Sequence, residues 1–158
     1  MIYMSIRCAA KALVLREGRL LLNRCREADG HVYYDLPGGG QRLYETLEDA
    51  VRREAREEAG YTVEINRFVA LAEEIYDDER LRQEYPDYAH RIYHISLTHL
   101  TGEQRHEPTE SDWHQDGSEW FTPEEVERLP RVFPSGIQNH LKNLLTRDAP
   151  LYLGCSHI

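Results

Sequence analysis

The chain has 158 residues, of which 41% are hydrophobic and 30% are charged, and its formal net charge is -9. No linker, repeat or low-complexity tract divides the chain, so we expect a single domain over residues 1–158. The negative charge disfavours a nucleic-acid polymer as partner, because binding to such a backbone depends on a basic surface. A small phosphate compound is compatible with this charge, because divalent cations held by carboxylates can neutralise it.

Cysteine usage and the N-terminal sequence bear on the cellular compartment. Cys8, Cys25 and Cys155 are odd in number and far apart, which argues against a disulfide framework and against a cysteine zinc site. Arg7 and Lys11 interrupt the first apolar residues early, so no signal peptide is expected, and no apolar run reaches membrane length. We expect a cytoplasmic protein without a membrane partner, and both a monomer and a homodimer are compatible with the sequence.

The first part of the chain predicts a hairpin followed by a glycine-rich loop. Two apolar-rich runs, 9–16 and 19–24, are separated by Glu17 and Gly18, the pattern of two strands joined by a tight turn. A short strand over 32–36 ends at Pro37, and the three glycines that follow favour an irregular backbone able to approach other groups closely. This loop leads into the clearest helix of the sequence.

That helix is predicted over residues 47–59, with Thr46 as its N-cap and Gly60 after its end. Further along the chain we expect a polar connection over 77–89, and a capping box at Thr122 opens a short helix. Other predicted elements are strands over 62–65, 68–76, 90–101 and 118–121 and an amphipathic helix over 135–145. The apolar tail, residues 151–158, is expected to pack either on a partner subunit or on its own domain. The order of elements predicts an α/β sandwich with helices on a curved sheet.

The glutamates of the predicted helix are placed unusually. With 3.6 residues per turn, Glu54 and Glu58 share a face with the apolar Leu47 and Val51. A glutamate-rich helix is ordinarily a solvated surface, but here the opposite face already carries charged side chains, including Arg52. Carboxylates turned toward the body of a protein need compensation of their charge.

A metal ion would provide that compensation. Glu54, Glu57 and Glu58 are spaced so that their carboxylates repel one another, whereas a divalent ion would hold all three ionised. Ligands that are all oxygen favour Mg²⁺ or Mn²⁺ over zinc. The sequence therefore predicts a site for a hard divalent cation on this helix.

The same segment resembles the Nudix box. The residues that carry the resemblance lie between positions 39 and 61 and are Gly39, Glu45, Arg53, Glu54, Glu57, Glu58 and Gly60, with Ala55 and Tyr61 at the apolar positions. The resemblance implies a Nudix α/β/α sandwich with a mixed, curved β-sheet. It also implies Mg²⁺-dependent hydrolysis, with Mn²⁺ as the other candidate ion, of a nucleoside diphosphate linked to another group.

Residue by residue, the resemblance assigns metal binding to Glu54, Glu57 and Glu58, with the backbone carbonyl of Gly38 as a further ligand. Either Glu54 or Glu57 is a candidate general base. Glu45 and Arg53 are expected to fix the loop against the helix, and Gly39 and Gly60 to be structural. Candidate bases on the later loop, 102–117, are Glu110, Asp112 and Asp116.

Substrate-binding candidates are Arg24, which could reach a phosphate, and Asn139, which by analogy could read a base edge. Arg42 and Tyr44 depart from the family pattern, which commonly has an acidic residue and a glycine there. The leading substrate is a nucleoside triphosphate that releases pyrophosphate. A nucleotide sugar or a dinucleoside polyphosphate is the alternative substrate, and a nucleotide-sensing module without hydrolysis is the alternative function. A purely structural acidic domain would require solvent-facing glutamates.

Overall fold

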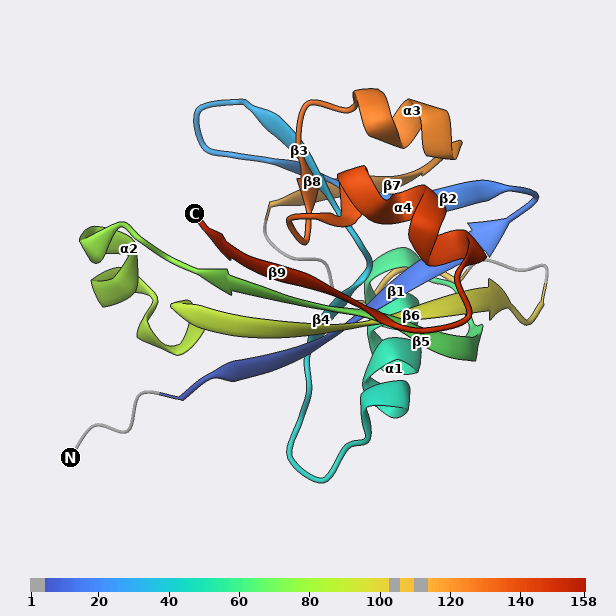
Figure 1. The fold of residues 1–158 in the computed structure, drawn as a ribbon, viewed down its shortest axis with the longest axis horizontal. Helices are drawn as coiled ribbons and strands as arrows, with labels where there is room; N and C mark the ends of the chain where they lie inside the picture. Colours follow the sequence, from blue (N-terminus) through green and yellow to red (C-terminus); the bar gives the residue numbers. More distant parts are fainter. Residues whose placement is uncertain (1–4, 103–105, 110–113) are drawn as a thin grey trace.

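The computed structural model describes residues 5–102, 106–109 and 114–158. In these parts of the chain, nine strands form one mixed sheet with the main order β8-β3-β2-β1-β6-β5-β9, while β4 pairs with β1 and β7 with β2 (Figure 1). The strands are β1 (Arg7–Arg16), β2 (Arg19–Arg26), β3 (Val32–Asp35), β4 (Gly38–Gly40), β5 (Val63–Ile75), β6 (His90–Leu100), β7 (Gln115–Phe121), β8 (Val132–Phe133) and β9 (Leu151–His157). The helices are α1 (Leu47–Ala59), α2 (Glu79–Glu84), η1 (Pro86–Tyr88, a 3₁₀-helix), α3 (Pro123–Arg128) and α4 (Ile137–Thr146).

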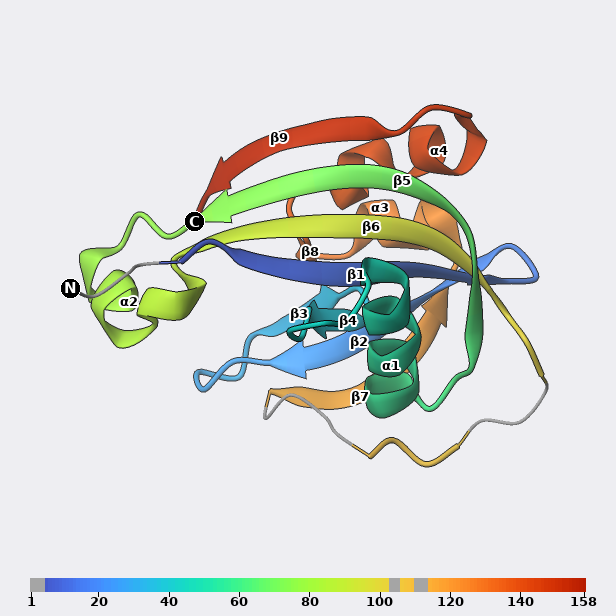
Figure 2. The ribbon, with the colours of Figure 1, turned by 90° about the horizontal axis from the view of Figure 1, so that it is seen from below.

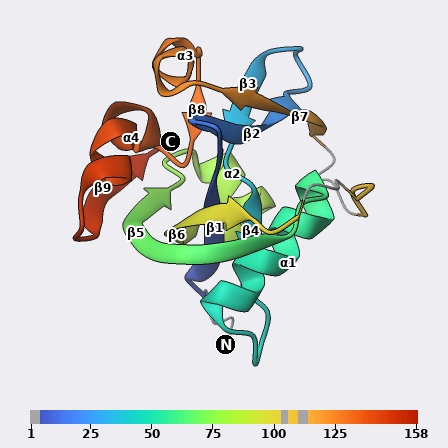
Figure 3. The same cartoon turned by 90° about the vertical axis from the view of Figure 1, so that its right-hand side faces the viewer.

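Helices cover both faces of the curved sheet, as the sequence predicted. Figures 2 and 3 show α1 on one face and α3 with α4 on the other. Side chains alternate between the two faces along a strand, and in β1 the residues Ala10, Ala12 and Val14 belong to the core under α1. Ala9 and Leu13 belong to the core under α3 and α4. The predicted α/β class with helices on a mixed, curved sheet is therefore confirmed.

The central strand β1 changes its neighbour along its length. It pairs with β2 only at Leu15↔Leu20 and Arg16↔Arg19, and β4 then pairs with it over Ala9, Ala10 and Lys11. The sequence predicted an irregular loop at the glycines of β4, and the structure shows a short antiparallel strand. Pairing with β1 satisfies the backbone of this segment and brings it beside α1.

Helix α1 begins and ends where the sequence predicted. The side chain of Thr46 accepts a hydrogen bond from the backbone nitrogen of Asp49 at 3.1 Å, and Gly60 has the left-handed conformation, with φ of 76°. The residues of α1 that lie buried against the sheet are Ala50, Val51, Ala55 and Ala59. No helix in the described ranges has both the length and the apolar character needed to span a bilayer.

Two predicted regions differ from the expectations, and the tail follows one of its two expected alternatives. The two strands expected over 62–65 and 68–76 are the single strand β5, because β-bulges at Ile65/Arg67 and Phe68/Ala70 absorb the break in the pattern. The polar connection contains α2, capped by Asp78, and η1; neither has a buried residue, so no apolar periodicity marked them. The tail forms β9, which pairs with β5 of its own chain.

Candidate active site

The backbone of β4 passes so close to its neighbours that side chains would not fit. A Cβ atom added to Gly38 would lie 2.1 Å from the carbonyl oxygen of Ala10. A Cβ atom on Gly39 would lie 2.7 to 2.8 Å from the carboxylate atoms of Glu54. Both glycines are required by this close approach, and Gly38 also has a positive φ of 145°. The Glu54 carboxylate consequently lies directly against the β4 backbone.

Arg53 ties the loop after β4 to the acidic face of α1. Its Nε and Nη2 donate to the two carboxylate oxygens of Glu45 at 2.7 and 2.9 Å, and Nη2 also donates to the carbonyl of Gly40 at 3.0 Å. Its Nη1 donates to Glu54 at 2.5 Å and to Glu57 at 3.0 Å. Hydrogen bonds from Arg53 lower the pKa of Glu45 to about 2. The Arg53–Glu45 ion pair holds the loop in a fixed position relative to the helix.

Glu58 is held by hydrogen bonds from two strands of the sheet. One of its oxygens accepts hydrogen bonds from the Asn23 side chain at 2.8 Å and from the backbone nitrogen of Gly38 at 2.9 Å. Burial raises the pKa of Glu58 to about 7, although Lys11 and the Gly38 N–H oppose this rise. The charge of the Glu58 carboxylate is therefore only partly compensated.

Lys11 lies beneath this site and is almost fully buried. Its Nζ donates to Asp35 at 2.9 Å and to the carbonyl oxygens of Leu36 and Gly38 at 3.1 Å each. Burial would lower the pKa of Lys11, but the carboxylates of Asp35 and Glu58 raise it above its usual value, so the amine stays charged. The Gly38 carbonyl, predicted from the sequence as a metal ligand, thus already accepts one hydrogen bond.

Sequence reasoning missed Lys11 and Asn23 as parts of the site. Each is a polar residue inside an otherwise apolar strand, and such a residue is buried only when a partner compensates it. That signal was present in the sequence. It could not name the partners, because Asp35 is 24 residues from Lys11 and Glu58 is 35 residues from Asn23 along the chain.

The donor set of α1 suits a divalent cation, although its carboxylates do not converge on one point in this arrangement. Arg53 stands between Glu54 and Glu57, and Glu58 is held by its own hydrogen bonds. Glu54 and Glu58 lie against the glycine backbone and Arg53 links Glu57 to Glu54, and three carboxylates with this placement are the oxygen ligands that a hard cation prefers.

Among the described residues, one group of three potential metal ligands has its ligand atoms within 4.8 Å of one another: Glu27, Asp29 and His31 in the β2–β3 connection. His31 and Asp29 are exposed and form an ion pair of 2.8 Å. The hydrogen bond that the His31 ring donates to the Asp29 carboxylate raises the pKa of His31. An exposed acidic turn of this kind is common without any bound ion.

The remaining site residues predicted from the sequence have no described contact with the α1 carboxylates. Arg24 forms ion pairs with Asp116 at 3.1 Å and with Glu119 at 3.8 Å, so Asp116, expected on a loop, lies in β7 opposite a cation. Asn139 is exposed on α4, on the other side of the sheet from α1. Glu110 and Asp112 lie outside the described residues.

The two departures from the family pattern occupy the loop before α1. Tyr44 has a positive φ of 65° and is 98% exposed, so its ring contributes no packing, and its backbone conformation explains why a glycine suits this position. Arg42 lies 3.6 Å from Glu57 and is also largely exposed. The loop therefore adds a cation beside the helix carboxylates.

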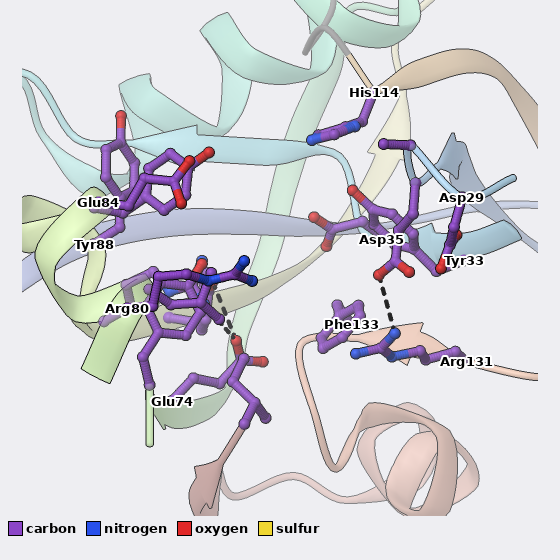
Figure 4. Close-up of a pocket in the computed structure, with 18 residues that line it drawn as sticks. Asp29, Tyr33, Asp35, Glu74, Arg80, Glu84, Tyr88, His114, Arg131 and Phe133 are labelled. Atoms are coloured by element: carbon purple, nitrogen blue, oxygen red, sulfur yellow. Dashed lines mark hydrogen bonds and ion pairs between the residues drawn. The ribbon is translucent and has the colours of Figure 1, made fainter. Parts of the chain in front are cut away.

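A cleft of about 940 Å³ opens on the sheet face opposite α1 (Figure 4). Its lining includes Tyr33 and Asp35 of β3, Phe133 of β8, Glu74 of β5, Arg91 and Tyr93 of β6, and Tyr88 of η1. Asp35 lines this cleft and also accepts the hydrogen bond from Lys11, which contacts the Gly38 carbonyl. The Lys11–Asp35 pair therefore connects the cleft to the backbone beside Glu58.

Comparisons with known proteins agree with this fold. A family model described as the NUDIX domain matches residues 6–142. Similar solved structures include an ADP-ribose pyrophosphatase from Streptococcus suis, with 21% identity, 96% of this chain and 100% of that chain covered, and a TM-score of 0.61. A MutT protein from Bacillus halodurans has 22% identity, coverage of 96% and 90%, and a TM-score of 0.67. A NUDIX hydrolase from Nitrosomonas europaea has 17% identity, coverage of 99% and 82%, and a TM-score of 0.68.

The sandwich fold, with helices on a mixed, curved sheet, is the fold that the sequence resemblance implied. The family model covers most of the chain, and the chain belongs to the Nudix hydrolase family.

Proposed function

We propose that this protein is a Mg²⁺-dependent hydrolase, with Mn²⁺ as a possible substitute, that cleaves a diphosphate linkage in a nucleotide. The observation that carries the proposal is the placement of the α1 carboxylates against β4. Glu54 lies beside Gly39, and Glu58 accepts a hydrogen bond from Gly38. A strand without side chains lets the α1 carboxylates approach its backbone, and these carboxylates can hold the cation that a phosphate group requires.

The residues that would hold the ion are Glu54, Glu57 and Glu58, with the second lone pair of the Gly38 carbonyl. A bound Mg²⁺ supplies Lewis-acid polarisation of the phosphoryl oxygens and neutralises charge on the leaving phosphate. Glu54 or Glu57 would accept the proton of the water that attacks phosphorus, because Glu54 lies beside the glycine strand and Arg53 links Glu57 to it. Arg53, which contacts both carboxylates, would keep their oxygens in position.

Lys11 and Asn23 would act as positioning residues for this site. Lys11 fixes the carbonyls of Leu36 and Gly38, and Asn23 fixes one oxygen of Glu58. A small displacement of such groups changes the alignment of the reacting atoms and slows the reaction strongly. The site is thus supported from the sheet as well as from the helix.

A nucleoside triphosphate that releases pyrophosphate is the leading substrate in this proposal. A nucleotide sugar or a dinucleoside polyphosphate is the alternative, and the cleft near Asp35 offers room for the part of either molecule beyond the diphosphate. The fold does not choose among them, because it is shared by proteins described as a MutT protein and as an ADP-ribose pyrophosphatase. We further propose that the chain acts in the cytoplasm, as one domain, in a monomer or a homodimer.

The test is an activity panel with a matched pair of variants. Nucleoside triphosphates, nucleotide sugars and dinucleoside polyphosphates are incubated with the purified protein over a titration of Mg²⁺. Glu57→Gln should lower kcat by about 100-fold or more, the contribution of a positioned acid–base or ligand group. Glu48→Gln removes a carboxylate from the exposed side of the same helix and should leave kcat unchanged. Nucleotide binding without turnover of any compound would indicate a sensing module instead, and turnover unaffected by Glu57→Gln would refute the assignment of the site.

A further inference from the structure

Arg7, the first residue of β1, holds its guanidinium between the wall of the cleft and β4. Its Cζ lies 4.2 Å from the centroid of the Tyr88 ring in η1, where a cation and an aromatic ring attract each other. A Cβ atom added to Gly40 would come within 2.4 Å of the Nη2 atom of Arg7. The guanidinium therefore occupies the space that a side chain at position 40 would need.

The charge of Arg7 is balanced differently from that of its neighbours on this sheet face. Lys11 is paired with Asp35 at 2.9 Å. Arg91, which lies next to Arg7 in register on β6, is paired with Glu74 at 3.3 Å. Within the described ranges, the Arg7 guanidinium has the Tyr88 ring as its partner and no carboxylate. In a chain with a net charge of -9, a guanidinium without an acidic partner is available to an anion.

The position of Arg7 relative to the α1 carboxylates follows from the alternation of β4. Gly39 faces Glu54, and Gly40 faces Arg7 on the other side of the strand. Because β4 carries no side chains, only its backbone separates the carboxylate from the guanidinium. A diphosphate at the edge of β4 would have the carboxylate-bound cation on one side and the guanidinium on the other.

Arg24 is the phosphate-binding candidate from the sequence. Its guanidinium is less available to an anion than that of Arg7, since Asp116 and Glu119 form ion pairs with it. We propose that Arg7 is a substrate-binding residue whose guanidinium donates hydrogen bonds to a phosphate oxygen of the nucleotide, and that Tyr88 positions it. The proposal rests on the proposed function of the site. Guanidinium groups bind phosphate through two parallel N–H donors, and stacking on an aromatic ring fixes the plane of those donors.

A purely structural role for Arg7, as a bridge between η1 and β4, makes different predictions. Loss of a structural bridge would lower the melting temperature and would weaken charged and uncharged ligands alike. Loss of a phosphate contact would raise KM with little change in kcat, would weaken only phosphorylated ligands, and would reduce the salt dependence of binding. These readouts separate the two roles.

The first experiment compares steady-state kinetics on the best substrate of the panel. Arg7→Gln should raise KM by about 10- to 100-fold, the loss expected for a charge-assisted hydrogen bond. Gly40→Ala keeps the charge of Arg7 but displaces its guanidinium, and it should raise KM in the same direction. Tyr88→Phe keeps the ring and should resemble the native protein, whereas Tyr88→Leu should not. Arg56→Gln removes the same charge from the exposed side of α1 and should leave KM unchanged.

The second experiment measures binding without turnover, by calorimetry with α,β-methylene-ADP in Mg²⁺ and with adenosine as the uncharged match. Arg7→Gln should weaken α,β-methylene-ADP about 10-fold or more and leave adenosine unchanged. If the native protein hydrolyses its substrate and Arg7→Gln shows native KM and native affinity, the role of Arg7 is refuted while the proposed function stands. If the native protein neither hydrolyses nor binds any nucleotide of the panel, the proposed function fails and the role of Arg7 with it. Equal weakening of both ligands would establish the structural role instead.

Discussion

Glu58→Gln should abolish a pH dependence of the free energy of unfolding that the native carboxyl confers on the metal-free protein. The carboxyl is buried, and one of its oxygens accepts both hydrogen bonds, from Asn23 and from Gly38. A glutamine has nearly the same shape and can keep both bonds with its amide oxygen. It carries no titratable proton, so the substitution removes the titration and leaves the packing in place.

The magnitude follows from the displaced pKa. Burial raises the pKa of Glu58 from 4.5 to about 7, which corresponds to roughly 3 kcal/mol of differential interaction between the two protonation states. The folded state therefore binds this proton more tightly than the unfolded state. The contribution is fully present below pH 4.5 and is lost as the pH rises through 7.

The assay is urea denaturation in EDTA at several pH values from 4.5 to 8, for both proteins. The difference in unfolding free energy between native protein and variant cancels the titration of all other groups. As the pH rises, the native protein should lose about 3 kcal/mol of unfolding free energy relative to the variant. Added Mg²⁺ at pH 8 should then stabilise the native protein more than Glu58→Gln, because the ligand must be ionised to bind the ion. If the difference in unfolding free energy stays constant across this range, the pKa of Glu58 is not raised in the folded protein. That result would refute the prediction.

Two further substitutions test the loop and the glycine strand. Glu45→Gln breaks the paired contact with Arg53 and should lower the unfolding free energy by about 3 kcal/mol, whereas Glu27→Gln at the exposed pair with Arg131 should cost less than about 1 kcal/mol in the same denaturation assay. Equal losses at both sites would contradict the fixed loop. Gly39→Ala places a methyl group against the Glu54 carboxylate and should lower kcat by about 100-fold, since a displacement of about 1 Å has that effect; an unchanged kcat would show that this carboxylate has no part in the reaction.

The helix and its acidic face could be predicted because their signals are local. The cap at Thr46, the glycine at position 60 and the spacing of Glu54 and Glu58 each depend on residues within a few turns of one another. Such patterns place side chains on one face whatever the rest of the chain does. The structure added the partners of Glu58, which accepts hydrogen bonds from Asn23 and from the backbone of Gly38.

Local sequence patterns predicted neither the short helix α2 nor the strand that the tail forms, and the reasons are opposite. Helix α2 has no buried residue, so it leaves no apolar periodicity, and the cap at Asp78 was its only mark. The tail is apolar, but a strand needs a partner, and β9 finds it in β5, whose residue Leu71 pairs with Tyr152 across 81 residues of chain. Hydrogen-bonded pairing at that separation is not encoded by any short pattern.

The sequence alone determined the acidic helix of the Nudix box and the run of glycines before it, because both depend on residues close together in the chain. That the glycines form a strand paired with β1 was decided by the tertiary structure. Tertiary structure decided which other side chains join them. Lys11 and Arg7 come from β1, and the pairing of β1 with β4 sets their place beside the site. Asn23 comes from β2 and contacts the site through its hydrogen bond to Glu58. A residue's spacing in sequence reports its neighbours only within one helix or strand, whereas the contacts of a sheet depend on register, which the whole fold fixes.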